Sequence, residues 1–244
     1  MVNKTALVTG GNSGIGFATA KVLKQQGATV IITGRRKEAL EKAAQELGVA
    51  FYLADQSRVS DVEALVQHVQ KAFGQLDILF INAGVLGQFS IEQATEEMYD
   101  YIMGINLKGA YFTLSRFIPV LKDGASVVFL SSNTASMTTP GISIYASSKA
   151  ALNSIVRTAA LELADRKIRV NAVSPGPTET EVMNKLGYDG KKLDDIKDWI
   201  LERVPLRKMG TAENVGKMVA FLCSDAADFI TGSEVLMDGG MVLA

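Results

Sequence analysis

The chain has 244 residues, of which 48% are hydrophobic and 21% charged, and this composition supports a buried core and disfavours an intrinsically disordered protein. Its 25 basic and 26 acidic side chains leave a net charge of −1, without the basic field that binds a phosphate backbone, so no nucleic acid partner is expected. The only cysteine, Cys223, and the only histidine, His68, exclude an intrachain disulfide and a clustered metal site, so no metal is expected.

Apolar runs are short throughout the chain, and Val127–Leu130 is among the longest. A bilayer crossing needs roughly 18 apolar residues, so no membrane partner is expected. The first ten residues lead into a glycine turn without the basic and long apolar segments of a secretory signal. We therefore expect a cytoplasmic, unprocessed protein.

Short, β-branched apolar runs alternate with amphipathic segments. Continuous apolarity is typical of strands buried on both faces, and the alternation predicts an α/β fold with a doubly wound parallel sheet and helices on both faces. A capping box at Ser60–Glu63 marks the start of one intervening helix. The runs expected to form strands are Thr5–Thr9, Thr29–Thr33, the weaker Phe51–Leu53, Ile78–Ile81, Val127–Leu130, Ile168–Val173 and Glu234–Met237.

Three further features are interpreted from their local pattern. His68 lies between the apolar positions of its helix and is expected to be a solvated surface residue, although a hydrolase triad would have to use it. Cys223 follows an apolar run and is expected in the core. Residues 181–207 have the weakest pattern and are expected to form a functional loop with one or two short helices.

A glycine-rich turn, Thr9-Gly10-Gly11-Asn12-Ser13-Gly14-Ile15-Gly16, follows the first strand and opens a helix expected to end near Gln26, with Gly27 beyond it. Glycines at such a junction let a dinucleotide pyrophosphate approach the N-terminus of the helix. The spacing Gly-x-x-x-Gly-x-Gly differs from the usual Gly-x-Gly-x-x-Gly. The expected cofactor contacts in this turn are Gly10, Asn12, Ser13, Gly14, Ile15 and Gly16.

The end of the second strand indicates which dinucleotide binds. An acidic residue there usually holds the ribose hydroxyls of NAD, but this chain continues with Gly34-Arg35-Arg36-Lys37. A guanidinium chelates phosphate oxygens, so Arg35, with Arg36 as a second candidate, favours NADP(H). The alternative is a solvated, basic start to a helix.

Tyr145 and Lys149 lie four residues apart in a helical pattern that runs to about Ala164, and therefore share one face. The ammonium of Lys149 is expected to lower the pKa of Tyr145 and to make it a better proton donor near neutral pH. Taken alone, the pair is equally typical of two surface residues.

Together with the glycine turn, this pair is one of several motifs in a characteristic order. The others are Asn82-Ala83-Gly84, Asn106, Ser132 and Pro175-Gly176. In this set of motifs the chain resembles the short-chain dehydrogenase/reductase family over essentially its whole length. The resemblance implies a single Rossmann-type catalytic domain over residues 1–244, with 181–207 as its substrate loop, that transfers hydride between a nicotinamide and a carbonyl or secondary alcohol.

The resemblance also assigns roles to the catalytic residues. Tyr145 would be the general acid/base, and Ser132 would bond the substrate oxygen, with the adjacent Ser131 as the alternative. Lys149 would lower the pKa of the tyrosine and bond the nicotinamide ribose, and Asn106 would hold a water in the proton relay. A helix cap or kink is the alternative for Asn106.

Further cofactor contacts implied by the resemblance are Asp55, Asn82, Ala83, Gly84, Tyr145, Lys149, Pro175, Gly176, Thr178 and Thr180. Gln56-Ser57 replaces the common apolar-Thr pair after Asp55. Ser13 stands where NADP-using members often have arginine, so Arg35 becomes the principal phosphate ligand and NAD(H) remains the alternative cofactor.

The substrate is expected to be a small carbonyl or alcohol. Within the family, a 3-oxoacyl group on carrier protein or a sugar are alternatives, and a non-catalytic dinucleotide sensor is the alternative outside enzymes. The family resemblance implies a homotetramer, or a homodimer, formed through the helix of Tyr145 and the helix around Tyr111–Leu121. Residues expected to border the substrate pocket are Asn133, Thr134, Ser136, Met137, Thr138 and Thr139.

Overall fold

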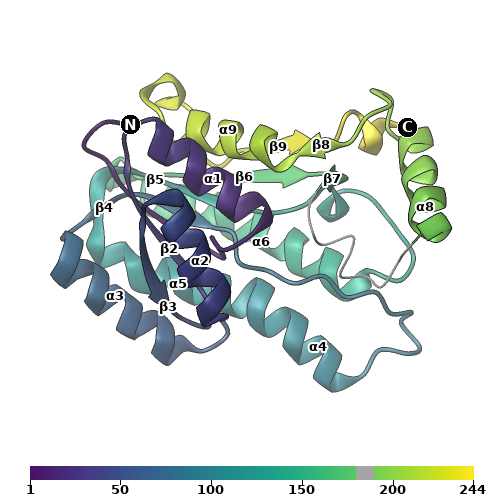
Figure 1. Ribbon diagram of the computed structural model, residues 1–244, viewed down its shortest axis with the longest axis horizontal. Coiled ribbons are helices and arrows are strands. Elements are labelled where there is room, and N and C mark those ends of the chain that lie inside the picture. Colours follow the sequence, from purple (N-terminus) through teal and green to yellow (C-terminus); the bar gives the residue numbers. More distant parts are fainter. Residues whose placement is uncertain (180–189) are drawn as a thin grey trace.

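A parallel sheet lies at the centre of the computed structural model, which describes residues 1–179 and 190–244, and for 190–194 the backbone alone (Figure 1). Within these residues the sheet has seven strands in the order β3-β2-β1-β4-β5-β6-β9, and every neighbouring pair is parallel. The strands are β1 (Thr5–Thr9), β2 (Thr29–Gly34), β3 (Ala50–Leu53), β4 (Leu76–Ile81), β5 (Leu121–Leu130), β6 (Arg169–Pro175) and β9 (Glu234–Met237).

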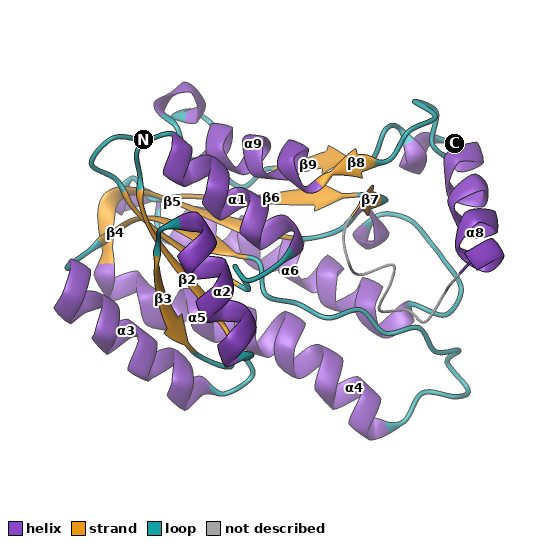
Figure 2. Ribbon diagram, in the orientation of Figure 1, coloured by secondary structure: helices purple, strands orange, loops and turns teal. Residues whose placement is uncertain are grey.

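Helices cover both faces of this sheet. The buried hydrophobic residues accordingly form two separate cores, one on each face of the sheet. In β1, Leu7 packs into one core, and its neighbours Ala6 and Val8 pack into the other. Figure 2 shows the resulting layers of helix, sheet and helix. On the side of Ala6 and Val8 lie α1 (Gly14–Gln25), α2 (Lys37–Leu47) and α9 (Ala212–Leu222), and on the side of Leu7 lie α3 (Val59–Phe73), α5 (Ala110–Phe117) and α6 (Ser143–Glu162). The predicted doubly wound fold is confirmed.

The remaining elements connect these layers or extend beyond them. The main ones are α4 (Glu96–Met103), a π-helix over Gly104–Gly109, α8 (Gly190–Arg203) and a two-stranded parallel pair, β7 (Thr178–Glu179) with β8 (Gly210–Thr211). Short 3-10 helices cover Ile118–Val120, Asn133–Ala135, Ala164–Arg166, Asp225–Ala227 and Met241–Leu243. No helix in the described residues combines the length and apolarity that a membrane crossing requires.

The predicted strands are all present, but β3, β4 and β5 begin earlier than the predicted runs. β5 begins at Leu121 rather than Val127, and its pairing with β4 shifts register between Leu76 and Ile78. At the start of β4, the carboxylate of Asp77 accepts bonds from the backbone N–H of Thr5 at 2.7 Å and from Lys122 Nζ at 2.9 Å. Polar residues at strand starts can therefore belong to the sheet although they interrupt the apolar pattern.

The predicted capping box is wrong, because α3 begins at Val59 and Ser60 lies inside it. The carboxylate of Asp61 accepts a bond from the backbone N–H of Asp55 at 3.1 Å. A tight turn that leads from Asp55 to Arg58 starts the helix one residue before the expected cap. The end of α1 is confirmed, with Gln26 as C-cap and Gly27 at φ +89°.

His68 is half-buried rather than fully solvated. Its ring lies 4.6 Å from that of Tyr52 and 6.3 Å from that of Phe73, centroid to centroid. The edge strand β3 supplies Tyr52, and no sequence pattern links it to α3. Cys223 is buried in the core as expected, and burial raises the pKa of its thiol to about 11.

Candidate active site

The carboxyl ends of β1 and β4 meet where the strand order reverses, which is the usual binding crevice of such sheets. Asn82, just after β4, donates from Nδ2 to the carbonyl oxygens of Thr9 at 2.8 Å and Gly10 at 3.1 Å. In return, Thr9 Oγ1 accepts from the backbone N–H groups of Asn82 and Ala83, each at 3.0 Å. Asn82 therefore fastens the glycine turn to the end of β4.

The glycine turn is too crowded for side chains. Gly10 has φ +65°, and a Cβ there would lie 2.9 Å from Asn82 Nδ2. A Cβ at Gly16 would strike the carbonyl oxygen of Gly10. The turn and the first turn of α1 can pack this closely only with glycine, which leaves backbone N–H groups at the start of the helix accessible to a ligand.

At the glycine turn and the start of α1, some hydrogen-bond donors have no acceptor among the side chains that the structure describes. Ser13 is the N-cap of α1, but its side chain accepts no capping bond, and the first turn of the helix carries no acidic residue. The buried Nδ2 of Asn12 has no hydrogen-bond partner. An anionic group would supply the missing acceptors, so these residues fit the pyrophosphate of a dinucleotide.

Arg35 directly follows β2 and is exposed, as is Arg36. Its Nη2 donates a hydrogen bond of 2.8 Å to the hydroxyl of Tyr101 in α4. This bond, together with the negative charge of Asp55, raises the pKa of Arg35 above its ordinary value. Asp55 Oδ1 accepts bonds from the backbone and the hydroxyl of Ser57, at 2.9 and 2.8 Å, in a turn that closes after β3.

The structure brings Tyr145, Lys149 and Ser132 together. The side chain of Ser132, just after β5, hydrogen-bonds that of Tyr145. Lys149, one turn further along α6, is 3% exposed; its Nζ donates to the carbonyl oxygen of Leu130 at 2.7 Å and lies 5.7 Å from the centroid of the Tyr145 ring. A Cβ at Gly84 would lie 3.6 Å from this Nζ, so Gly84 lies directly beside the ammonium.

The expected lowering of the pKa of Tyr145 by Lys149 is wrong for the side chains as they lie. Burial raises the pKa of Tyr145, and the hydrogen bond with Ser132 offsets this only in part. Burial also lowers the pKa of Lys149 to about 8. Low-dielectric surroundings disfavour both charged forms, and the ammonium bonds a backbone carbonyl rather than the phenol.

The two adjacent serines have different surroundings. Ser131 donates from its hydroxyl to the carbonyl oxygen of Lys149 at 3.3 Å and thus ties β5 to α6. The hydroxyl of Ser132 accepts bonds from the backbone and the hydroxyl of Thr134, at 3.2 and 3.0 Å, and bonds Tyr145 as well. Ser132 rather than Ser131 therefore lies beside the phenol.

Asn106 lies in the π-helix between α4 and α5 and is buried. Its Oδ1 accepts from the backbone N–H of Val85 and its Nδ2 donates to the carbonyl of Val85, both at 2.8 Å. Nδ2 also lies 3.3 Å from the hydroxyl of Ser148, which donates to the carbonyl oxygen of Tyr145 at 2.6 Å. Asn106 thus joins the segment after β4 to the turn of α6 that carries Tyr145, and π-helices often occur at functional sites.

Gln56 is a residue of the site that the sequence interpretation did not identify. It is 8% exposed, and its Nε2 donates to the carbonyl oxygens of Ala83 at 3.0 Å and Ile105 at 3.2 Å. The second acceptor lies in the π-helix next to Asn106, where the altered bonding pattern needs a side-chain donor. The departure from an apolar residue at this position was the signal available in the sequence.

We expect Gln56→Leu to destabilise the fold by about 1–3 kcal/mol and to lower kcat, because two buried carbonyl groups lose their donor beside Asn106. Urea denaturation and steady-state kinetics measure the two effects. Gln45→Leu, at an exposed glutamine on α2, is the matched control and should change neither. Unchanged stability of Gln56→Leu would contradict the bridging role.

The segment after β6 lies at the same edge of the sheet. A Cβ at Gly176 would lie 2.6 Å from Cβ of Asp238, so Gly176 allows close passage of the C-terminal segment. The hydroxyl of Thr178 donates to the carbonyl oxygen of Gly176 at 3.0 Å, and Pro175 ends β6. Thr180 and residues 181–189 of the expected substrate loop lie outside the described residues, and α8 occupies most of the rest of that loop.

Next to Ser132, a buried amide separates two thioethers. Asn133 Nδ2 lies 3.2 Å from the sulfur of Met137 and 3.7 Å from that of Met241. Met241 belongs to the C-terminal 3-10 helix, which the sequence interpretation did not connect with this region. The segment that follows β5 and the C-terminal end of the chain therefore lie close together beside the candidate catalytic serine, Ser132.

Comparisons with known proteins find similarity along nearly the whole chain. A family model described as Enoyl-(Acyl carrier protein) reductase matches residues 10–242. Oxidoreductase asL5 of Sarocladium schorii is 37% identical over 246 residues, which cover 99% of this chain and 96% of that protein. The 3-oxoacyl-[acyl-carrier-protein] reductase FabG of Thermotoga maritima is 34% identical over 247 residues, 98% of each chain.

A solved structure extends the comparison to three dimensions. A crystal structure titled as a short-chain dehydrogenase/reductase, glucose/ribitol dehydrogenase, from Brucella melitensis superposes with a TM-score of 0.90 at 31% identity. The superposition covers 99% of this chain and 97% of that chain. With its fold, its motif order and these matches along nearly its whole length, the chain belongs to the short-chain dehydrogenase/reductase family of oxidoreductases.

Proposed function

We propose that this protein transfers hydride between NADP(H) and a small carbonyl or secondary alcohol substrate, with Tyr145 as general acid/base. The observation that carries the proposal is the grouping of Tyr145 with the buried Lys149, whose Nζ lies 5.7 Å from the centroid of the tyrosine ring, beside Ser132, which interacts with the phenol. Residues 1–244 then act as one catalytic domain in the cytoplasm, and 181–207 borders the substrate.

When bound, the nicotinamide dinucleotide supplies or accepts the hydride. Tyr145 donates its phenolic proton to the carbonyl oxygen during reduction and takes it back during oxidation. Ser132 donates a hydrogen bond to the same oxygen and stabilises the charge that develops on it. Because the side chains of Ser132 and Tyr145 interact, we propose that the substrate oxygen is held between their two hydroxyls.

Lys149 and Asn106 support this proton transfer. One N–H of Lys149 bonds Leu130, which leaves two for the nicotinamide ribose. With a pKa of about 8, the ammonium remains mostly protonated at neutral pH and keeps its N–H donors for the ribose. Asn106 holds a water for the return of the proton and positions Tyr145 through Ser148.

We assign the other cofactor contacts from the positions of the residues around the crevice at the carboxyl ends of β1 and β4. The glycine turn, including Ile15, holds the pyrophosphate, and Asp55 lies where the adenine binds. Ala83 and Gly84 lie along the ribose, while Gly176 and Thr178 border the nicotinamide. Arg35 binds the 2′-phosphate that distinguishes NADP(H) from NAD(H), and Arg36 is its second ligand.

A reduction screen with both cofactors tests this function. The panel contains a 3-oxoacyl thioester, sugars and simple ketones, because the names of the relatives include a 3-oxoacyl carrier-protein reductase and a glucose/ribitol dehydrogenase. We expect NADPH-dependent reduction of at least one of them. Binding of NADPH without reduction of any compound would favour a dinucleotide-sensing protein instead.

In the same assay, Arg35→Ala should raise KM for NADPH by about 10- to 100-fold with little change for NADH, since a charged hydrogen-bond donor to the phosphate is lost. The matched variant Arg36→Ala should have the smaller effect. Equal changes of KM for the two cofactors would contradict the phosphate role of Arg35.

We further propose that four copies of the chain form a homotetramer. A homodimer is the alternative and would be half of this assembly. A groove of about 750 Å³ lies along the π-helix and α6, where Tyr111 is half exposed, and we propose that it receives the same helix pair of a second copy. Near the C-terminal end of the chain, the apolar side chains of Phe221 on α9, Phe229 and Leu236 on β9 are exposed. A tetramer with closed symmetry needs two separate self-complementary surfaces, and we propose that these side chains belong to the second one.

A further inference from the structure

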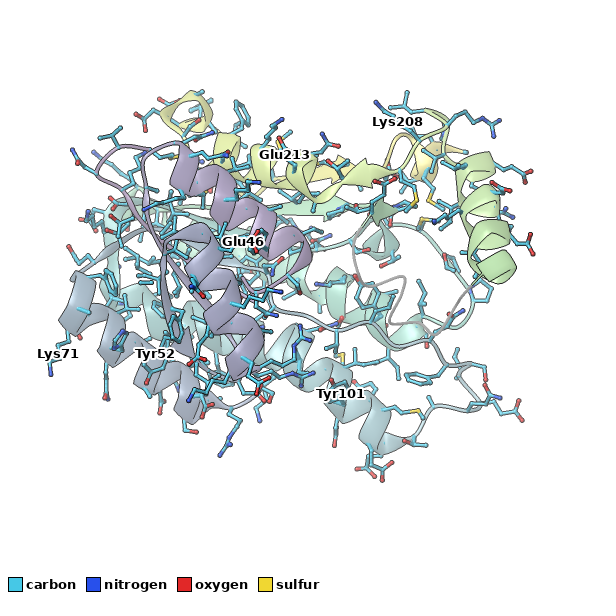
Figure 3. The ribbon with its side chains drawn as sticks, in the orientation of Figure 1. Glu46, Tyr52, Lys71, Tyr101, Lys208 and Glu213 are labelled. Atoms are coloured by element: carbon cyan, nitrogen blue, oxygen red, sulfur yellow. The ribbon has the colours of Figure 1, made fainter. Side chains whose placement is uncertain are left out.

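An arginine and a tyrosine from distant parts of the chain meet at the edge of the candidate cofactor crevice. Arg35 follows β2, and Tyr101 projects from α4, where Figure 3 labels it. Nη2 of Arg35 donates to the hydroxyl of Tyr101 at 2.8 Å, and the guanidinium carbon lies 5.8 Å from the ring centroid. The guanidinium is therefore held by a hydrogen bond to the hydroxyl and by a cation–π contact with the ring of the same side chain.

The surroundings of this pair are those of a ligand site at the ends of neighbouring strands. The charge of Asp55, after β3, reaches Arg35 and contributes to raising its pKa. A Cβ at Gly34 would lie 2.9 Å from Oδ1 of Asn12, so the amide of Asn12 lies against the residue that precedes Arg35. The Nδ2 of this amide is buried without a partner. The amide of Asn12 and the backbone from which Arg35 projects therefore lie side by side at the crevice.

A stabilising role in the fold does not account for the pair. Arg35 is exposed and Tyr101 is 49% exposed, so their bond competes with water and adds little to stability. A free arginine side chain samples many rotamers, and immobilising it lowers the affinity for its ligand. The bond to Tyr101 removes part of that freedom beforehand, and it uses only one of the five N–H donors of the guanidinium.

We propose that Tyr101 is a positioning residue for cofactor specificity, which holds the guanidinium of Arg35 ready for the 2′-phosphate of NADP(H). The proposal rests on the proposed use of NADP(H) and on Arg35 as the phosphate ligand. It assigns the discrimination between NADP(H) and NAD(H) to α4 as well as to the end of β2. Since Tyr101 lies five residues before Asn106, one continuous helical segment then serves both ends of the cofactor.

The test is Tyr101→Phe, which keeps the ring and removes only the hydroxyl. Dissociation constants of NADPH and NADH are measured by fluorescence titration of the full-length protein. We expect the dissociation constant of NADPH to rise about tenfold and that of NADH to stay the same. Unchanged NADH binding also reports that the variant is folded. Tyr99→Phe, at a tyrosine two positions away that is 48% exposed, is the matched control and should alter neither constant.

A double-mutant cycle shows whether Tyr101 acts through Arg35. In the Arg35→Ala background, Tyr101→Phe should change NADPH binding by less than about twofold, because the group that it positions is gone. A full effect in that background, or equal effects on NADPH and NADH, overturns the positioning role. If Arg35→Ala reduces the preference for NADPH but Tyr101→Phe does not, the inference fails and the proposed function stands. If Arg35→Ala leaves the preference unchanged, the phosphate role of Arg35 and this inference both fail, while the proposed reaction stands.

Discussion

Tyr145→Phe should lower kcat for carbonyl reduction by about 10²- to 10⁴-fold, the usual contribution of a positioned general acid, while NADPH still binds. The substitution removes the transferable proton and the bond to Ser132 but keeps the ring in place. Loss of NADPH absorbance gives the rate, and fluorescence titration gives the binding. Tyr52→Phe, a tyrosine on β3 outside the site, is the control and should be fully active. Near-normal turnover of Tyr145→Phe would contradict its assignment as the acid.

The pH dependence of the wild-type reaction follows from the same residue. Burial raises the pKa of Tyr145, so the phenol stays protonated through neutral pH and can act as an acid. Reduction should therefore persist at neutral pH and be lost as the pH rises through that pKa, whereas oxidation of an alcohol should accelerate as the phenolate forms. Initial rates in the two directions across an alkaline pH series measure this. A reduction rate that increases with pH would show that another group donates the proton.

Lys149→Met should lower kcat/KM by at least about 10²-fold and, at the same time, make the fold more stable at neutral pH. The pKa of Lys149 is about 8 against 10.5 for the ordinary side chain, so protonation costs more in the folded protein than in the unfolded chain. At about 1.4 kcal/mol per pKa unit this amounts to about 3 kcal/mol, from which about 1 kcal/mol is subtracted for the unpaired carbonyl of Leu130. A net gain of about 2 kcal/mol is expected.

The direction of the pKa shift of Lys149 determines the pH range over which Lys149→Met is more stable than the wild type. Between pH 8 and 10.5 the unfolded chain holds more protons on Lys149 than the folded protein, so wild-type stability rises with pH over that range. The advantage of Lys149→Met should therefore be largest below pH 8 and disappear above 10.5. Urea denaturation of both proteins at the two limits measures it. Lys122→Met, which removes a lysine paired with Asp77 at the surface, is the control and should not be more stable. A destabilised Lys149→Met would show that this lysine supports the fold rather than the reaction.

The local sequence pattern was sufficient to predict the strands of the sheet and to select most of the candidate site residues. Strands β1 and β9 have the predicted bounds, because their residues are apolar and bounded by turns at both ends. The interpretation was less accurate where polar residues take part in the sheet, as at the start of β5, and where a tight turn replaced the expected capping box before α3. For β5 the deciding partner, Asp77, lies elsewhere in the chain, whereas for α3 the deciding contact is the local turn from Asp55 to Arg58.

The sequence by itself determined the family resemblance, the doubly wound sheet and the expectation that Tyr145 and Lys149 share a helix face, because these depend on residue order and short spacings. Only the tertiary structure decided that Ser132 rather than Ser131 meets the phenol, that Gln56 bridges to the π-helix and that Tyr101 holds Arg35. It also reversed the expected direction of the pKa of Tyr145. Burial and hydrogen-bond partners control these properties, and both come from segments far apart in the sequence that folding brings within a few ångströms.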